Sequence, residues 1–225
     1  MNLKKKLSYK RNSKKLFIIL PQWGGKFHHN FFLRKKLLKN NFSVLELEFP
    51  ESILSSNWKS TLDSFLFIKE STIEEIRKLK EKYEFEEIKI IGISLGCVNA
   101  CMVASNNSDI SEILLIVPGH CLAESMWEGK VTQEIRRSYK NKGISLKELK
   151  KHWYTLAPEN NLKAFESKKI SILLSKKDKA IPFYCGKKLV KKIKSLNQSV
   201  TYKENQHFGH KMTALSFLLR PHKYL

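Results

Sequence analysis

The chain has 225 residues, of which 42% are hydrophobic and 11% aromatic. This length suits one domain, and the apolar content is enough for a large core, which excludes an intrinsically disordered chain. The 42 Lys and Arg residues outnumber the 21 Asp and Glu residues, so the formal net charge is +21. Such a charge attracts nucleic acids, anionic membranes or acidic substrates. Because arginines interleaved with exposed aromatic residues are not found, we do not expect a nucleic-acid partner.

The positive charge is densest in Lys4–Lys15 and Lys187–Lys194, and either segment could contact an anionic surface or attract an anionic substrate. A general bias toward lysine is the simpler explanation of most of this charge. The first apolar run, Leu16–Leu20, is too short for a signal-peptide core or a membrane span, and no other run approaches a spanning length. The four cysteines show no metal-ligand spacing, so we expect a soluble, cytoplasmic protein with reduced thiols.

Apolar runs of strand length alternate with helical patterns along the chain. The predicted strands, in chain order, are Leu16–Leu20, Phe42–Phe49, Ile88–Ile91, Ile113–Val117, Ile170–Leu174 and Val200–Tyr202. The predicted helices are Phe31–Lys39, a helix that ends near Tyr83, Val98–Ala104, Cys185–Ile193 and Lys211–Leu219. This alternation predicts an α/β fold in which helices cover both faces of a mostly parallel sheet.

Two predicted helices begin with the pattern of a capping box, in which a serine is followed three residues later by a glutamate. Ser71 and Glu74 form the first pattern, and Ser145 and Glu148 form the second. The second pattern lies within the segment from about 121 to 167, where no strand is predicted. A segment of this length between two strands is too long for a simple crossover, so it predicts a helical cap inserted into a single domain.

The segment Gly92–Gly96, Gly-Ile-Ser-Leu-Gly, lies between a predicted buried strand and a predicted helix. At such a turn a serine has a strained backbone that exposes its hydroxyl, and close approach of the chain requires glycine two residues before and after it. The following helix directs backbone N–H groups toward the hydroxyl. This setting predicts that Ser94 is a nucleophile, with a structural turn serine as the alternative.

A serine nucleophile requires a histidine that accepts its proton and a carboxylate that orients the histidine. Asp178 closely follows one predicted strand, and His207 and His210 follow the last one. The carboxyl ends of parallel strands meet at one edge of a sheet, so these side chains are expected to lie near one another. Taken singly, each of them could instead be an ordinary exposed residue.

At this point the chain resembles the α/β-hydrolase family over roughly residues 16 to 219. The resemblance rests on Gly92–Gly96, on Asp-x-x-Ile-Pro at 178–182 and on a histidine in the loop after the last strand. It implies an α/β-hydrolase fold and a catalytic triad that contains Ser94 and Asp178. It also implies chemistry that needs neither a metal nor an organic cofactor.

The spacing that is usual in the family selects between the two candidate bases. His207 lies twenty-nine residues after Asp178 and is followed by Phe-Gly, whereas His210 lies thirty-two residues after it. The resemblance therefore favours His207, and His210 remains the alternative because loop lengths vary.

The resemblance also implies an oxyanion hole formed by two backbone N–H groups. One is expected from Leu95, directly after the nucleophile, and the other from the loop Pro21–Gly25, where Trp23 has the corresponding position. This loop lacks the His-Gly pair that is common in the family, so a residue adjacent to Trp23 is the alternative donor.

Several other residues could line a substrate pocket. His120 follows another predicted strand, and no chemical role is expected for it. His152, Trp153 and Tyr154 lie in the predicted cap and could cover the acyl site, but packing between elements explains them equally well.

The sequence thus predicts a serine hydrolase that cleaves a small or medium acyl ester or thioester through an acyl-enzyme. A serine peptidase or an acyltransferase would use the same residues. Two other classes remain open, a non-catalytic ligand-binding protein of this fold and a basic peripheral protein that binds anionic membranes.

Overall fold

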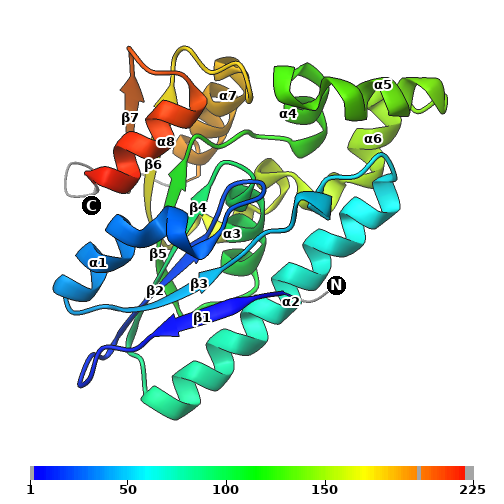
Figure 1. The fold of residues 1–225 in the computed structure, drawn as a ribbon. Coiled ribbons are helices and arrows are strands. Elements are labelled where there is room, and N and C mark those ends of the chain that lie inside the picture. Colours follow the sequence, from blue (N-terminus) through cyan, green and yellow to red (C-terminus); the bar gives the residue numbers. More distant parts are fainter. Residues whose placement is uncertain (1–2, 197–198, 221–225) are drawn as a thin grey trace.

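The computed structural model of the chain describes residues 3–196 and 199–220. Its strands form one seven-stranded sheet in the order β1-β3-β2-β4-β5-β6-β7 (Figure 1). The strands are β1 (Lys5–Ser8), β2 (Lys15–Leu20), β3 (Ser43–Leu47), β4 (Glu87–Ile93), β5 (Ile110–Ile116), β6 (Lys169–Ser175) and β7 (Val200–Asn205). All neighbouring strands are parallel except β1, which pairs antiparallel with β3. The predicted mostly parallel α/β sheet is therefore confirmed, and so are all six predicted strands.

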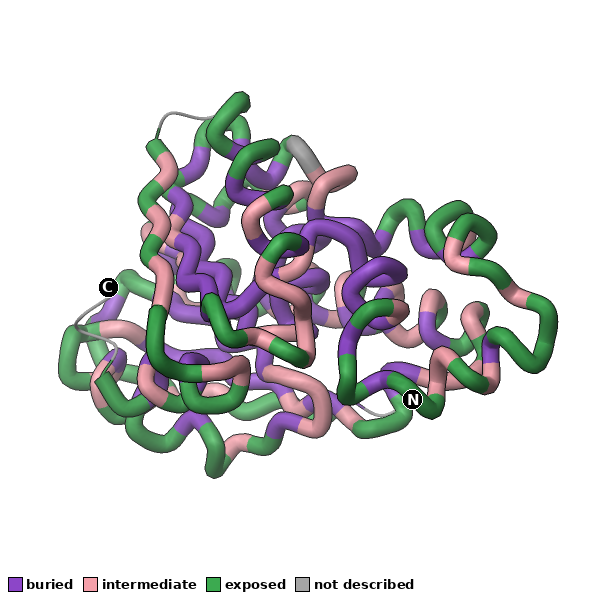
Figure 2. The backbone as a smooth tube through the Cα atoms, turned by 90° about the horizontal axis from the view of Figure 1, so that it is seen from above, coloured by how far each residue is buried: buried purple, intermediate pink, exposed green. Residues whose placement is uncertain are grey.

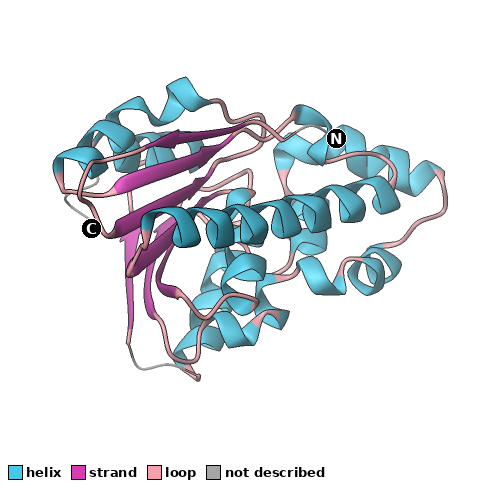
Figure 3. Cartoon of the chain, turned by 90° about the horizontal axis from the view of Figure 1, so that it is seen from below, coloured by secondary structure: helices cyan, strands magenta, loops and turns pink. Residues whose placement is uncertain are grey.

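Alternating side chains of the strands enter two separate hydrophobic clusters, because successive residues of a strand point to opposite faces. Ile19 of β2 packs with helices α1 (Phe31–Lys39) and α8 (His210–Leu219). Ile18, its neighbour, belongs to the larger cluster with α2 (Trp58–Tyr83), α3 (Gly96–Ser105) and α7 (Phe183–Lys194). Helices thus cover both faces of the sheet (Figure 3), and the buried residues gather in the interior of the molecule (Figure 2).

The long helix α2 begins earlier than the sequence predicts. Asn57 caps it, because its side-chain oxygen accepts hydrogen bonds from the backbone N–H groups of Lys59 and Ser60. The buried stripe of the helix includes Phe65 and Ile68, so the apolar face extends well before Ser71. The prediction that a capping box at Ser71 starts this helix is therefore wrong.

The segment between β5 and β6 contains helices α4 (Leu122–Glu128), α5 (Gln133–Asn141) and α6 (Leu146–His152) and no described strand; they gather at one end of the molecule (Figure 1). Ser145 forms the predicted capping box with Glu148 at the start of α6. Short 3-10 turns fill the rest of the segment, at Lys130–Thr132, Tyr154–Leu156, Pro158–Asn160 and Leu162–Ala164.

The chain also has an antiparallel edge strand and four free cysteines. The edge strand β1 lies within the basic N-terminal segment, where the sequence analysis predicted no strand. All four cysteines, Cys97, Cys101, Cys121 and Cys185, are buried and free. Among the described residues, no helix combines the length and the apolar character that crossing a membrane requires.

Candidate active site

Ser94 lies in a sharp turn between β4 and α3, with a backbone φ of 54°, in the left-handed region. A Cβ on Gly92 would lie 2.5 Å from the Cα of Cys97, and a Cβ on Gly96 would collide with the backbone carbonyl of Leu20. Both glycines are therefore required by close backbone contacts. The strained turn raises the hydroxyl of Ser94 above the carboxyl end of the sheet, as the sequence predicts.

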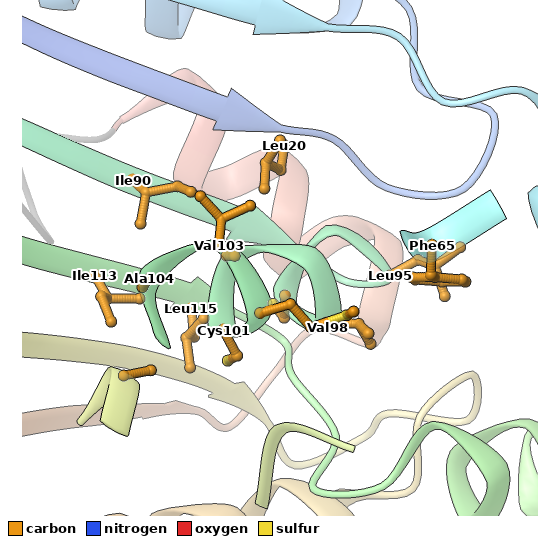
Figure 4. Packing of buried hydrophobic residues seen from close by; sticks show 14 of the residues in the cluster. Leu20, Phe65, Ile90, Leu95, Val98, Cys101, Val103, Ala104, Ile113 and Leu115 are labelled. Carbon is orange, nitrogen blue, oxygen red and sulfur yellow. The ribbon is translucent and has the colours of Figure 1, made fainter. Parts of the chain in front are cut away.

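Helix α3 holds this turn in place because it is buried on all sides. Val98, Cys101 and Val103 pack among residues of the central strands and of α2 (Figure 4). Its mean hydropathy is high and nearly uniform around the axis, as expected for a helix in the centre of a core. The turn that carries Ser94 is therefore attached to a helix that is buried in the core.

The imidazole of His210 joins Ser94 to Asp178. Its Nδ1 lies 2.6 Å from Oδ2 of Asp178, and its Nε2 lies 2.7 Å from Oγ of Ser94. A carboxylate can only accept, so Nδ1–H donates to Asp178 and Nε2 accepts the hydroxyl proton of Ser94. This is the tautomer that removes a proton from serine.

His207 does not take part in this arrangement, so the preference for His207 over His210 is wrong. The side-chain oxygen of Asn205 accepts hydrogen bonds from the backbone N–H groups of His207 and Phe208, both at 3.0 Å. This turn leaves His207 exposed at the surface. The chain then enters α8 at His210, which the first turn of the helix directs toward Ser94.

Asp178 is nearly buried, with 4% of its side chain exposed. The oxygen that does not face His210 accepts hydrogen bonds from the backbone N–H groups of Ala180 and Ile181, at 2.9 and 2.8 Å. These amides are neutral, so they fix the carboxylate without cancelling its charge. The full negative charge remains available to the imidazole.

A cavity of about 480 Å³ opens beside Ser94 and His210. Trp23 and Leu95, the two predicted oxyanion donors, both line it. Neither residue's backbone N–H donates a hydrogen bond to another group in the described ranges, so both remain available to a ligand. The indole of Trp23 donates to the backbone carbonyl of Glu51 at 2.7 Å, which fixes the position of the loop.

Most of the cavity wall is apolar. The apolar lining residues are Leu54, Leu122, Met126, Val131, Ala180 and Ile181. Charged groups lie among them, with Glu51 from the loop after β3 and Lys211 from α8. Neither residue was predicted from the sequence, since nothing in its local pattern distinguishes it from other surface charges.

A second buried polar cluster lies in the same part of the fold but does not line the cavity. His120 is 3% exposed, and its Nε2 lies 3.3 Å from the carboxylate of Glu124. Glu124 also accepts hydrogen bonds from Lys150 of α6 and Lys188 of α7, at 2.6 and 2.8 Å. This cluster ties α4 to two other helices.

Donor atoms of His120, Glu124 and Cys185 lie within 4.8 Å of one another, a grouping that could hold a metal ion. The lysines Lys150 and Lys188 already occupy both oxygens of Glu124, however. Burial raises the pKa of the Cys185 thiol to about 11, so the thiol is protonated. These three residues are thus held as a salt-bridged structural cluster, and we assign no metal to them.

His152 and Trp153 at the end of α6 pack against the start of α2, and neither they nor Tyr154 line the cavity. Trp153 is 1% exposed and donates its indole N–H to the backbone carbonyl of Trp58 at 2.9 Å. His152 stacks on the ring of Trp58 at 3.8 Å, and Tyr154 points to solvent. Of the two explanations that the sequence allowed, packing between elements is the one observed.

The sequence matches no protein-family model, and it matches no curated protein significantly. Solved structures resemble the fold clearly despite low sequence identity. The esterase Pf2001 from Pyrococcus furiosus is 15% identical and superposes with a TM-score of 0.65, over 99% of this chain and 87% of its own. Est1E from Butyrivibrio proteoclasticus is 13% identical, with a TM-score of 0.62 over 98% of this chain and 93% of its own.

A third structure, an acylaminoacyl peptidase from Pyrococcus horikoshii, is 12% identical and has a TM-score of 0.73. It matches 96% of this chain, which corresponds to only 38% of the longer peptidase. At such identities the similarity concerns the fold alone. The chain therefore has the α/β-hydrolase fold.

Proposed function

We propose that the protein is a serine hydrolase that cleaves acyl esters or thioesters through an acyl-enzyme on Ser94. The observation that carries the proposal is the continuous hydrogen-bonded series from Asp178 through His210 to Ser94 at the wall of a cavity. A histidine with a carboxylate on one nitrogen and a serine hydroxyl on the other is the arrangement that activates a serine.

In the first half-reaction, Oγ of Ser94 attacks the acyl carbonyl while Nε2 of His210 takes its proton. Asp178 holds the imidazole in the required tautomer and stabilises the imidazolium that forms. The backbone N–H groups of Trp23 and Leu95 donate to the oxyanion. His210 then gives the proton to the leaving group, and in the second half-reaction it activates the water that releases the acid.

The apolar wall of the cavity favours an acyl or alkyl substituent over a strongly polar one. Esters and thioesters have better leaving groups than amides, so they place the smallest demand on the same residues. The esterases among the similar folds agree with this choice, whereas the acylaminoacyl peptidase keeps amide cleavage as the second candidate.

Intact-mass measurement after treatment with a fluorophosphonate tests the proposal. We expect one adduct on the wild type and none on Ser94→Ala, whose esterase kcat should fall about a thousandfold or more. Ser125→Ala is the matched control, because Ser125 also lines the cavity but does not contact His210. Labelling of Ser94→Ala, or no adduct on the folded wild type, would contradict the proposal. An added alcohol that captures the acyl group would instead identify an acyltransferase.

A further inference from the structure

Helix α8 is apolar on both of its faces, although only one face is covered. Thr213, Ala214, Phe217 and Leu218 pack against the sheet. The opposite face carries the exposed side chains of Met212, Leu215 and Leu219, and Phe208 is exposed just before the helix begins; each of the four is between 41% and 50% exposed. Met212, Leu215 and Leu219 are three and four residues apart, so they follow one line along the helix. An outer helix face of a globular protein is normally polar.

The neighbouring helix α1 extends this apolar surface. Phe31 and Phe32 at its N-terminus are 49% and 57% exposed and contact each other edge to face. Helices α1 and α8 contact each other and lie side by side on the same face of the sheet (Figure 1). Six large apolar side chains are therefore exposed on one side of the molecule, which marks an interaction site.

The two segments that contain these helices carry charges of a single sign. From Lys26 to Asn41 and from Gln206 to Arg220 the sequence contains seven Lys and Arg residues and no Asp or Glu. Only Arg34 among them makes an ion pair in the described structure, with Glu46. The other cations, such as Lys35 and Lys39, are free to meet anionic groups outside the protein.

We propose that the surface formed by α1, α8 and Phe208 docks on an anionic lipid bilayer. Exposed aromatic and aliphatic side chains with surrounding lysines are the combination that binds at the interface of such a membrane. The surface adjoins the candidate active site, because His210 begins α8 and Lys211 lines the cavity. If the proposed function holds, docking brings the cavity to acyl esters of the membrane lipids.

A second copy of the chain fits this surface less well than a bilayer. Two copies that meet through it would bring together two clusters of unpaired lysines, and each copy has a formal net charge of +21. Like charges at an interface oppose association. An anionic bilayer supplies both the apolar phase and the opposite charge.

Co-sedimentation of the full chain with vesicles tests the docking directly. We expect binding to phosphatidylglycerol vesicles and little binding to phosphatidylcholine vesicles. Leu215→Ser with Leu219→Ser, and separately Lys35→Glu with Lys39→Glu, should each lower the bound fraction about tenfold or more. Lys147→Glu with Lys151→Glu on α6 is the matched control, since it changes net charge equally at exposed positions on another part of the molecule.

The proposal fails if the wild type does not sediment with phosphatidylglycerol, or if the α6 control lowers binding as much as Lys35→Glu with Lys39→Glu. It also fails if light scattering shows a dimer that the Leu215→Ser, Leu219→Ser variant abolishes. Ser94→Ala should bind vesicles like the wild type. Binding by this variant without hydrolysis of any soluble ester by the wild type would support docking and reject the serine-hydrolase function, so the two failures are distinguishable.

Discussion

Two histidines of this protein, the buried His120 and the partly buried His210, each lie beside a carboxylate, yet only His210 also contacts a serine hydroxyl. His210 has Asp178 on one nitrogen and the hydroxyl of Ser94 on the other. His120 has Glu124 at Nε2, while its Nδ1 has no partner among the described groups. A histidine next to an acid is therefore not sufficient, and what lies at its second nitrogen decides its role.

The two carboxylates also differ in the groups that surround them. Asp178 is fixed by neutral backbone amides, so its charge acts on His210. Burial acts to raise the pKa of the Glu124 carboxyl, but hydrogen bonds from Lys150 and Lys188 outweigh burial and hold that pKa at about 2. The lysines neutralise Glu124, and burial lowers the pKa of His120. Glu124 thus joins α4 to α6 and α7, whereas among the described residues the carboxylate of Asp178 hydrogen-bonds only to His210 and two backbone amides.

The largest effect on kcat is expected when the two candidate bases, His210 and His207, are each replaced by alanine. His210→Ala should lower the kcat for a soluble ester about 10⁵-fold, because the serine loses its proton acceptor. His207→Ala should leave kcat unchanged, since this imidazole is exposed and contacts no triad residue. Steady-state kinetics at saturating ester measures both. Activity in His210→Ala together with its loss in His207→Ala would restore the choice made from sequence spacing.

The two carboxylates provide the next comparison. Asp178→Asn should lower kcat about 10⁴-fold, because an amide no longer selects the tautomer that has a free Nε2. Glu124→Gln should retain the wild-type kcat, as Glu124 does not line the cavity. Circular dichroism of both variants checks that they are folded. A loss of kcat in folded Glu124→Gln would show that the second pair also takes part in the chemistry.

Glu124→Gln should instead reduce stability. Its lysine partners are half exposed and can regain water, so we expect the free energy of unfolding in urea to fall by only about 1–2 kcal/mol. Glu128→Gln on the same helix is the control, because Glu128 is exposed and has no ion pair in the described structure. An equal loss in both variants would mean that the contacts of Glu124 contribute nothing specific.

The same stability difference should depend on pH in a defined direction. The pKa of Glu124 is about 2 in the folded protein and 4.5 ordinarily, so the unfolded chain binds more protons between these values. The stabilisation is complete above pH 4.5 and is lost as the pH falls toward 2. Urea unfolding of the wild type and Glu124→Gln across this range should show the two curves converging on acidification. If the difference in the free energy of unfolding stays constant with pH, the ionisation of Glu124 does not cause it.

The smallest effect is expected from metal chelation. Because Lys150 and Lys188 occupy Glu124 and the Cys185 thiol is protonated, EDTA should leave both the esterase rate and the melting temperature unchanged. A loss that zinc restores, and that Cys185→Ala abolishes, would instead identify the His120 cluster as a metal site.

The sequence by itself determined the features that depend on local patterns. Short apolar runs of strand length and helical apolar patterns predict the six parallel strands and most of the helices. The turn at Gly92–Gly96 is equally local, because its backbone strain and close contacts demand particular residues at fixed positions. The nucleophile Ser94 and the acid Asp178 were therefore placed correctly at the sheet edge, and their catalytic roles remain proposals.

Tertiary structure decided whatever depends on the direction of a side chain or on a distant partner. His207 and His210 are three residues apart, and only the hydrogen bonds of Asn205 and the start of α8 at His210 decide which imidazole reaches Ser94. The number of residues between the acid and the base does not say in which direction either histidine side chain points. The pairing of β1 with β3 and the lysines on Glu124 likewise depend on contacts between segments far apart in sequence, which no local pattern records.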